Sequence, residues 1–172
     1  NGSRILGFGR YAGIIGAYNG LLTYGLKHAL YTLKPANKCI DRNEMDNYLN
    51  DVKLSNEKLL ITGKGRVGSG ILETIKKLNI EEVNIDDYLN KRFDQPVYLN
   101  IDVMDYNARI DGKDSTFSDF LNDSSLYKST FMKYAAKTDL FFAGHFYATG
   151  APYLFTRKDV KSHSFKISVV AD

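Results

Sequence analysis

The feature that most constrains this chain is a glycine-rich loop between a short apolar run and a helical pattern. Residues 59–61 are apolar and predict a buried strand, and glycines then follow in the spacing G-x-G-x-x-G at Gly63, Gly65 and Gly68. Residues 71–78 carry apolar side chains at helical spacing. A strand, a glycine turn and a helix in this order form the dinucleotide-binding fingerprint. The alternative interpretation is a glycine-rich turn that binds nothing.

Each residue of this loop has an expected physical role. Gly63 permits the tight turn, Gly65 lets the backbone approach a pyrophosphate, and Gly68 lets the helix pack close to the strand. Free N–H groups at the start of the helix, where Val67 lies, then face the phosphates. Arg66 could pair with a phosphate oxygen or remain solvated.

An acidic residue follows the loop near the distance that the fingerprint requires. Residues 83–85 predict a second strand that ends at Asp86, 23 residues after the first glycine of the loop. A carboxylate there accepts hydrogen bonds from the adenosine ribose and repels a 2′-phosphate, which favours NAD. Alternatively, Asp86 begins a short helix over residues 87–92. Lys91 and Arg92 keep NADP as an alternative cofactor.

A third strand is predicted at residues 96–102, with Asp102 at its C-terminal end. This end faces the ligand edge of a parallel sheet, so Asp102 could contact the adenine side of a cofactor or cap the following turn. Residues 106–136 form an insertion between strands, with helical pieces expected at 117–121 and 126–136.

Two further strands complete the predicted sheet, at residues 138–144 and 165–171. Gly144 would allow a nicotinamide to approach the backbone where the fourth strand ends. His145 follows, and such a histidine is either a structural hydrogen-bonding group or a proton-transfer catalyst. Alternation of strands and helices predicts an α/β fold, a Rossmann-type doubly wound parallel sheet with helices on both faces.

A long glycine-rich helix is expected ahead of this sheet, over residues 10–33, where Pro35 stops it. A stripe of four glycines suggests close contact with another backbone or with a ligand, and helix packing is the simpler explanation. The stripe consists of Gly9, Gly13, Gly16 and Gly20. We therefore divide the chain into a connecting segment, 1–35, and a dinucleotide-binding domain, 36–172. The abrupt first and last residues suggest a fragment of a longer protein.

Composition excludes several classes of function. Hydrophobic residues make up 44% and charged residues 25% of the 172 residues, as in globular domains. The net charge is only +3 without a basic tract, which argues against nucleic-acid binding. No apolar run approaches the ~20 residues that span a bilayer. The single Cys39 offers neither a disulfide nor a metal cluster, and we expect a cytoplasmic protein.

Several stretches together resemble the lysine-forming saccharopine dehydrogenases, members of the alanine dehydrogenase and transhydrogenase superfamily. The stretches that carry the resemblance are residues 4–13, 61–70, 151–153 and 168–172. The resemblance implies a two-domain enzyme in which one domain binds NAD and the other binds the amino-acid substrate. This chain would be the NAD-binding domain with the helix that leads into it.

The resemblance also assigns roles to individual residues. Gly65 and Arg66 match pyrophosphate-loop positions, and three positions match substrate contacts, namely Arg4, which would bind a carboxylate, Phe8 and Asp172. Ala171 and, in a looser local alignment, Ala143 match cofactor contacts. The family's catalytic Lys and His precede Asn1, so this chain should contain no catalytic residue. Asp86 does not fall cleanly on the family's acidic ribose position.

The expected function is that of an NAD-dependent oxidoreductase that oxidises the C–H beside the secondary amine of saccharopine and gives lysine and 2-oxoglutarate. The amino-acid substrate would bind with the help of the absent domain, and neither a nucleic acid nor a membrane is an expected partner. The alternatives are an alanine dehydrogenase-like oxidative deaminase and a non-catalytic dinucleotide sensor.

Overall fold

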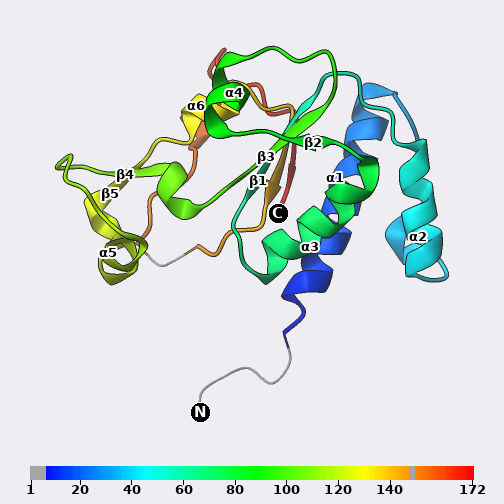
Figure 1. Cartoon of the computed structure of the whole chain (residues 1–172), viewed down its shortest axis with the longest axis horizontal. Coiled ribbons are helices and arrows are strands. Elements are labelled where there is room, and N and C mark those ends of the chain that lie inside the picture. The colour runs from blue at the N-terminus through cyan, green and yellow to red at the C-terminus, as the bar shows by residue number, and fades with distance from the viewer. Residues whose placement is uncertain (1–6, 148–149) are drawn as a thin grey trace.

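The computed structural model describes residues 7–147 and 150–172 of the chain and shows an α/β fold (Figure 1). Its centre is a five-stranded parallel sheet in the order β2-β3-β1-β6-β7. These strands are β1 Lys58–Thr62, β2 Glu81–Glu82, β3 Val97–Ile101, β6 Leu140–Ala143 and β7 Val169–Ala171. A separate antiparallel pair consists of β4 Asn107–Arg109 and β5 Tyr127–Ser129.

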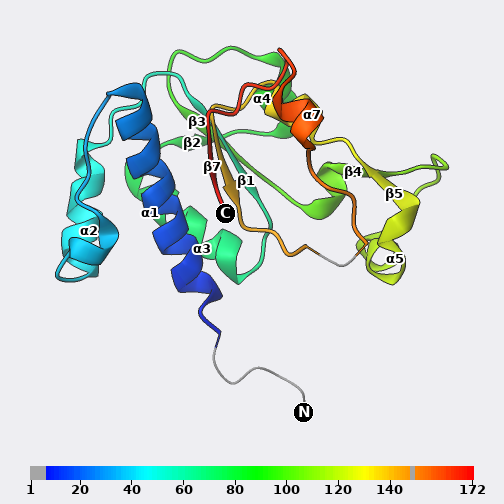
Figure 2. The ribbon, with the colours of Figure 1, turned by 180° about the vertical axis from the view of Figure 1, so that it is seen from behind.

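Helices flank the sheet, as Figures 1 and 2 show from opposite sides. The helices are α1 Gly9–His28, α2 Arg42–Tyr48, α3 Arg66–Ile75, α4 Ile85–Asn90, α5 Phe117–Asn122, α6 Met132–Ala135 and α7 Arg157–Val160. Helices α1, α2 and α3 contribute to one hydrophobic cluster, and α4 and α6 contribute to the other. The pair β4 and β5 extends to one side together with α5 (Figure 1).

The apolar run of β1 explains why this strand is central. Leu59 and Ile61 belong to the cluster beneath α1 and α3, whereas Leu60 belongs to the cluster beneath α4 and α6. Successive side chains of a strand point to opposite faces, so a continuous apolar run suits a strand that is covered on both. All three side chains are fully buried.

Helices α1 and α3 cross so closely that their backbones touch. A Cβ atom on Gly13 would lie 2.0 Å from the carbonyl oxygen of Val67, and one on Gly70 would lie 2.0 Å from that of Arg10. Gly20 faces the ring of Phe142 in the sheet. Close packing therefore explains these three glycines, whereas a Cβ on Gly16 would meet no atom within 4 Å in the described part of the chain.

Two local predictions are wrong. The first helix ends at His28 rather than near residue 33, because Ala29 adopts the left-handed conformation and its N–H returns to Gly25 and Leu26. The strand predicted at residues 83–85 is displaced, since β2 is Glu81–Glu82. Asn84 instead caps α4, where its side chain accepts the N–H of Asp87.

The insertion also differs from the prediction. Helix α5 lies where a helical piece was expected, but residues 126–136 begin with strand β5 and only then form α6. The β5 strand pairs with β4, a contact that periodicity within either segment does not reveal. In the described residues, no helix has the combination of length and apolar character that crossing a bilayer requires.

Two glycine substitutions in α1 should have opposite effects on stability. Gly13→Ala should lower the free energy of unfolding by about 1–3 kcal/mol, because its methyl group collides with the α3 backbone. Gly16→Ala should raise it by about 0.5–1 kcal/mol, because its methyl group enters open space within a helix. Urea unfolding measures both variants, and equal effects would contradict the described helix crossing.

Candidate functional site

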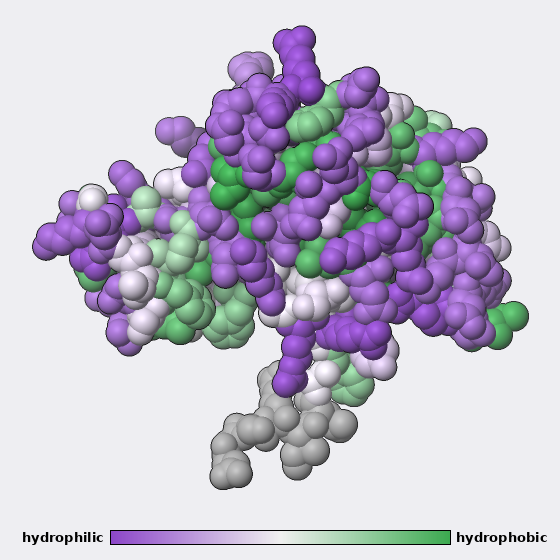
Figure 3. Space-filling model, viewed as in Figure 1, coloured by the Kyte–Doolittle hydropathy of each residue, from purple (hydrophilic) through white to green (hydrophobic). Residues whose placement is uncertain are grey.

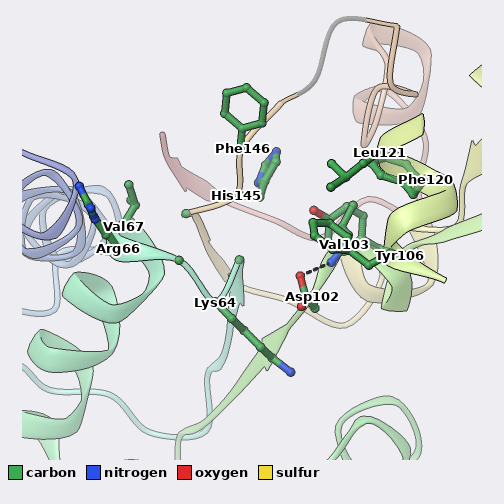
Figure 4. Close-up of a pocket in the computed structure, with 14 residues that line it drawn as sticks. Lys64, Arg66, Val67, Asp102, Val103, Tyr106, Phe120, Leu121, His145 and Phe146 are labelled. Carbon is green, nitrogen blue, oxygen red and sulfur yellow. Dashed lines mark hydrogen bonds between the residues drawn. The ribbon is translucent and has the colours of Figure 1, made fainter. Parts of the chain in front are cut away.

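A cavity of about 470 Å³ lies beside the glycine loop, at the carboxyl edge of the sheet (Figure 4). The loop after β1 forms one side of the cavity, and residues that follow β3 form the opposite side. His145 and Phe146, which follow β6, also line the cavity (Figure 4). Ligands of open α/β sheets bind at this edge, between two adjacent strands whose following connections run in opposite directions.

The glycine loop has the backbone geometry that its residues predict. Gly63 has a φ of +90°, which a glycine adopts at little cost, and its N–H donates to Ile101 at 2.9 Å. A Cβ on Gly68 would lie 2.0 Å from the carbonyl oxygen of Gly63, so the start of α3 sits directly against the loop. A Cβ on Gly144 would lie 2.8 Å from the carbonyl oxygen of Thr62, and the N–H of Gly144 donates to that same oxygen at 3.0 Å.

The N-terminus of α3 opens into the cavity. Gly65 is the residue that precedes the helix, and Gly65, Arg66 and Val67 all line the cavity. A Cβ on Gly65 would meet no atom within 4 Å among the described residues, so the space over its backbone is free. Unpaired N–H groups and the helix dipole favour an anion at such a position.

The side chain of Arg66 also reaches the segment ahead of α1. A Cβ on Gly7 would lie 2.5 Å from the Nη1 atom of Arg66, and one on Gly9 would lie 3.1 Å from its Cβ atom. The guanidinium therefore lies beside Gly7, at the edge of the cavity rather than across its centre (Figure 4).

Asp102 lies at the cavity wall that faces the glycine loop. Strand β3 is paired with β1, so its end brings Asp102 next to the loop. One carboxylate oxygen accepts the N–H of Val103 at 2.7 Å, which fixes the side chain at the start of the turn Val103–Asp105. Asp102 therefore caps the following turn and also lines the cavity, so the two roles expected for it are compatible.

The hydroxyl group of Tyr106 is an orphaned polar group in the same wall. Tyr106 is buried and lines the cavity, and its hydroxyl oxygen has no hydrogen-bond partner among the described residues. Burial raises the pKa of this phenol, and the charges of Asp102 and Asp105 raise it further. The group is therefore a neutral donor, and an unsatisfied buried donor is costly unless a ligand or water accepts its hydrogen bond.

His145 joins this cavity to a second one of about 330 Å³, which Ala143, Tyr153 and Asp172 also line. Its Nδ1 atom lies 2.7 Å from the hydroxyl oxygen of Thr62, a buried residue, so the imidazole is fixed at the end of β1. Burial lowers the pKa of His145, and the charge of Asp172 partly offsets this effect. A neutral imidazole is expected at physiological pH.

Four of the predicted site residues that the structure describes line neither cavity, namely Phe8, Gly68, Asp86 and Ala171. Asp86 lies in α4 and accepts a hydrogen bond from Asn90, and strand β3 separates β2 from β1. Ala171 lies in β7 with its Cβ toward Gly20 of α1. Phe8 is the exposed residue that precedes α1, and Arg4 lies outside the described residues.

Sequence reasoning did not identify the aromatic part of the wall. Tyr106, Phe117 and Phe120 line the cavity, and they come from the insertion after β3. The available signal was the amphipathic pattern of residues 117–121, in which Phe120 is buried while Phe117 and Leu121 remain exposed. Figure 3 shows the resulting apolar surface over the extension that carries α5.

Comparison with known proteins does not assign this site. The chain matches no protein-family model, and it has no significant match among curated proteins. Within the residues that the structure describes, no three His, Cys, Asp or Glu side chains are grouped as metal ligands would be.

The coupling between His145 and Asp172 can be tested by titration. Asp172→Asn should lower the pKa of His145 further, because the carboxylate favours the charged imidazolium. Two-dimensional NMR of the imidazole measures this pKa in both proteins. An unchanged or raised pKa in the variant would contradict the arrangement of these two residues.

Proposed function

We propose that this chain is the NAD-binding domain of an amino-acid oxidoreductase. The observation that carries the proposal is the free N-terminus of α3, which opens at Gly65 into a cavity at the carboxyl edge of the sheet. The position between β1 and β6 is where the strand order reverses, and dinucleotides bind there in doubly wound sheets.

We also propose that the sheet is a Rossmann-type doubly wound sheet. A Rossmann-type doubly wound sheet agrees with five parallel strands that helices flank on both faces. One difference is that the strand next to β1 on this side is β3, whereas β2 occupies the edge. In this interpretation α1 is the helix that leads in from a substrate domain.

The residues of the cavity fit the separate parts of a dinucleotide. The amide groups of Gly65, Arg66 and Val67 would hold the pyrophosphate. Asp102 would accept hydrogen bonds from the adenosine ribose, and the orphaned hydroxyl group of Tyr106 would donate one on the same side.

The second cavity would hold the other end of the cofactor. Ala143 and Asp172 line it, and Gly144 and His145 connect it to the first cavity. Bound NAD would supply hydride acceptance, while this chain would position the ring and keep water from it. Asp172 lines the same cavity and, as the family resemblance implies, would contact the amino-acid substrate.

The substrate class rests on the resemblance to the lysine-forming saccharopine dehydrogenases. The reaction would oxidise a C–H beside a secondary amine, and hydrolysis of the imine would give lysine and 2-oxoglutarate. A protein that joins this chain to the proposed substrate domain should produce NADH from saccharopine and NAD, whereas this chain alone should produce none. NADH formation with alanine but not saccharopine would assign the alternative deaminase activity.

Asp102, rather than Asp86, should determine cofactor choice. Asp102→Asn should weaken NAD binding about 10–100-fold, since it removes a charged acceptor of ribose hydrogen bonds, and should reduce discrimination against NADP. Asp86→Asn is the matched control and should leave both affinities unchanged, because Asp86 lies in α4. Isothermal titration calorimetry measures these affinities. If Asp86→Asn weakened NAD binding more than Asp102→Asn, Asp86 rather than Asp102 would be the residue that contacts the ribose.

A further inference from the structure

A separate cavity of about 590 Å³ lies at the opposite, amino edge of the sheet. The start of β1, the end of α4 and the segments that lead into β6 and β7 surround it. Five cationic side chains and one acidic side chain line it, namely Lys58, Lys91, Arg92, Lys137, Lys166 and Asp139. The lining side chains therefore carry four more positive than negative charges, whereas the net charge of the whole chain is only +3. Positive charge is thus concentrated at this cavity.

Lys58 fixes one of these charges at the cavity. Its Nζ atom donates to the carbonyl oxygens of Tyr88 and Lys91, and it lies 5.1 Å from the ring centroid of Phe93. These carbonyls belong to the C-terminal end of α4, where a cation is favourable. The fold therefore explains the position of Lys58.

The single acidic side chain of this cavity offsets the positive charges around it only in part. The Oδ2 atom of Asp139 accepts the backbone N–H of Lys58 at 2.8 Å. Burial lowers the pKa of the Lys58 ammonium group, and the charge of Lys137 lowers it further. The charge of Asp139 partly offsets these effects, and the charge of Lys166 adds to them. The positive charges are thus close enough to repel one another.

Three cations remain available at this cavity. Lys91 is paired with Asp87 at 2.8 Å, whereas Arg92, Lys137 and Lys166 form no ion pair within the described part of the chain. All three side chains belong to exposed residues, so a ligand can reach them.

We propose that this cavity binds the phosphate groups of a small polyanion. Lys137 and Lys166 would contact phosphate oxygens as point charges, and Arg92 would offer paired N–H donors. Binding would relieve the repulsion among the cations, which gives a physical reason for the charge excess. The site is independent of the glycine loop, because the two lie at opposite edges of the sheet.

Amide NMR with inorganic pyrophosphate, at constant ionic strength, tests the proposal. Pyrophosphate should shift the amide resonances of Lys137, Asp139 and Lys166, separately from those of Gly65–Val67 at the glycine loop. The double variant Lys137→Gln with Lys166→Gln should weaken binding at this cavity at least tenfold. Its NAD affinity should stay unchanged, so this test is separate from that of the proposed function.

A matched control removes the same charge elsewhere. Lys158→Gln with Lys161→Gln lies outside the cavity and should leave pyrophosphate binding there unchanged. A parallel titration with ADP shows whether a nucleotide is preferred over inorganic pyrophosphate. The proposal is overturned if pyrophosphate shifts no amide of this cavity, or if the control variant weakens binding as much as the double variant.

Discussion

The structure depends on backbone contacts that side chains would prevent. A Cβ on Gly68 would lie 2.0 Å from the carbonyl oxygen of Gly63, and a Cβ on Gly13 would lie 2.0 Å from that of Val67. A Cβ on Gly63 would lie 2.5 Å from the carbonyl oxygen of Gly144. Protein interiors are densely packed and do not absorb such overlaps easily, so these glycines set how β1, α3, α1 and the end of β6 meet.

These contacts also place the candidate site. Because Gly68 lets the start of α3 lie against the loop, Gly65 and Val67 line the cavity. The contact at Gly144 then brings His145 to Thr62 and joins the two cavities. The close backbone contacts at these glycines therefore determine both the packing of the elements and the geometry of the candidate site. A glycine can have both effects without contacting a ligand itself.

The sequence predicted the local parts of this arrangement well. The strand before Gly63, the helix after Gly65 and the positions of Asp102 and Gly144 at strand ends all follow from short-range patterns. Such patterns carry this information because a strand, a glycine turn and a helix are each specified by adjacent residues.

Other features depend on contacts between distant segments. Spacing alone selected Asp86, but β3 rather than β2 pairs with β1, so Asp102 reaches the cavity instead. Tyr106 and Phe120 reach the cavity through the insertion, whose β4–β5 pairing is not visible in either segment separately. The family resemblance anticipated a cofactor contact at Ala171, whose Cβ faces α1.

The central claim is that one dinucleotide occupies both cavities across Gly144 and His145. A crystal structure of the chain with NAD tests it most directly. We predict pyrophosphate oxygens within hydrogen-bond distance of the amides of Gly65 to Val67, with the adenosine beside Asp102 and the nicotinamide beside Ala143. NAD bound elsewhere, or a glycine loop that stays free at saturating NAD, would contradict the claim.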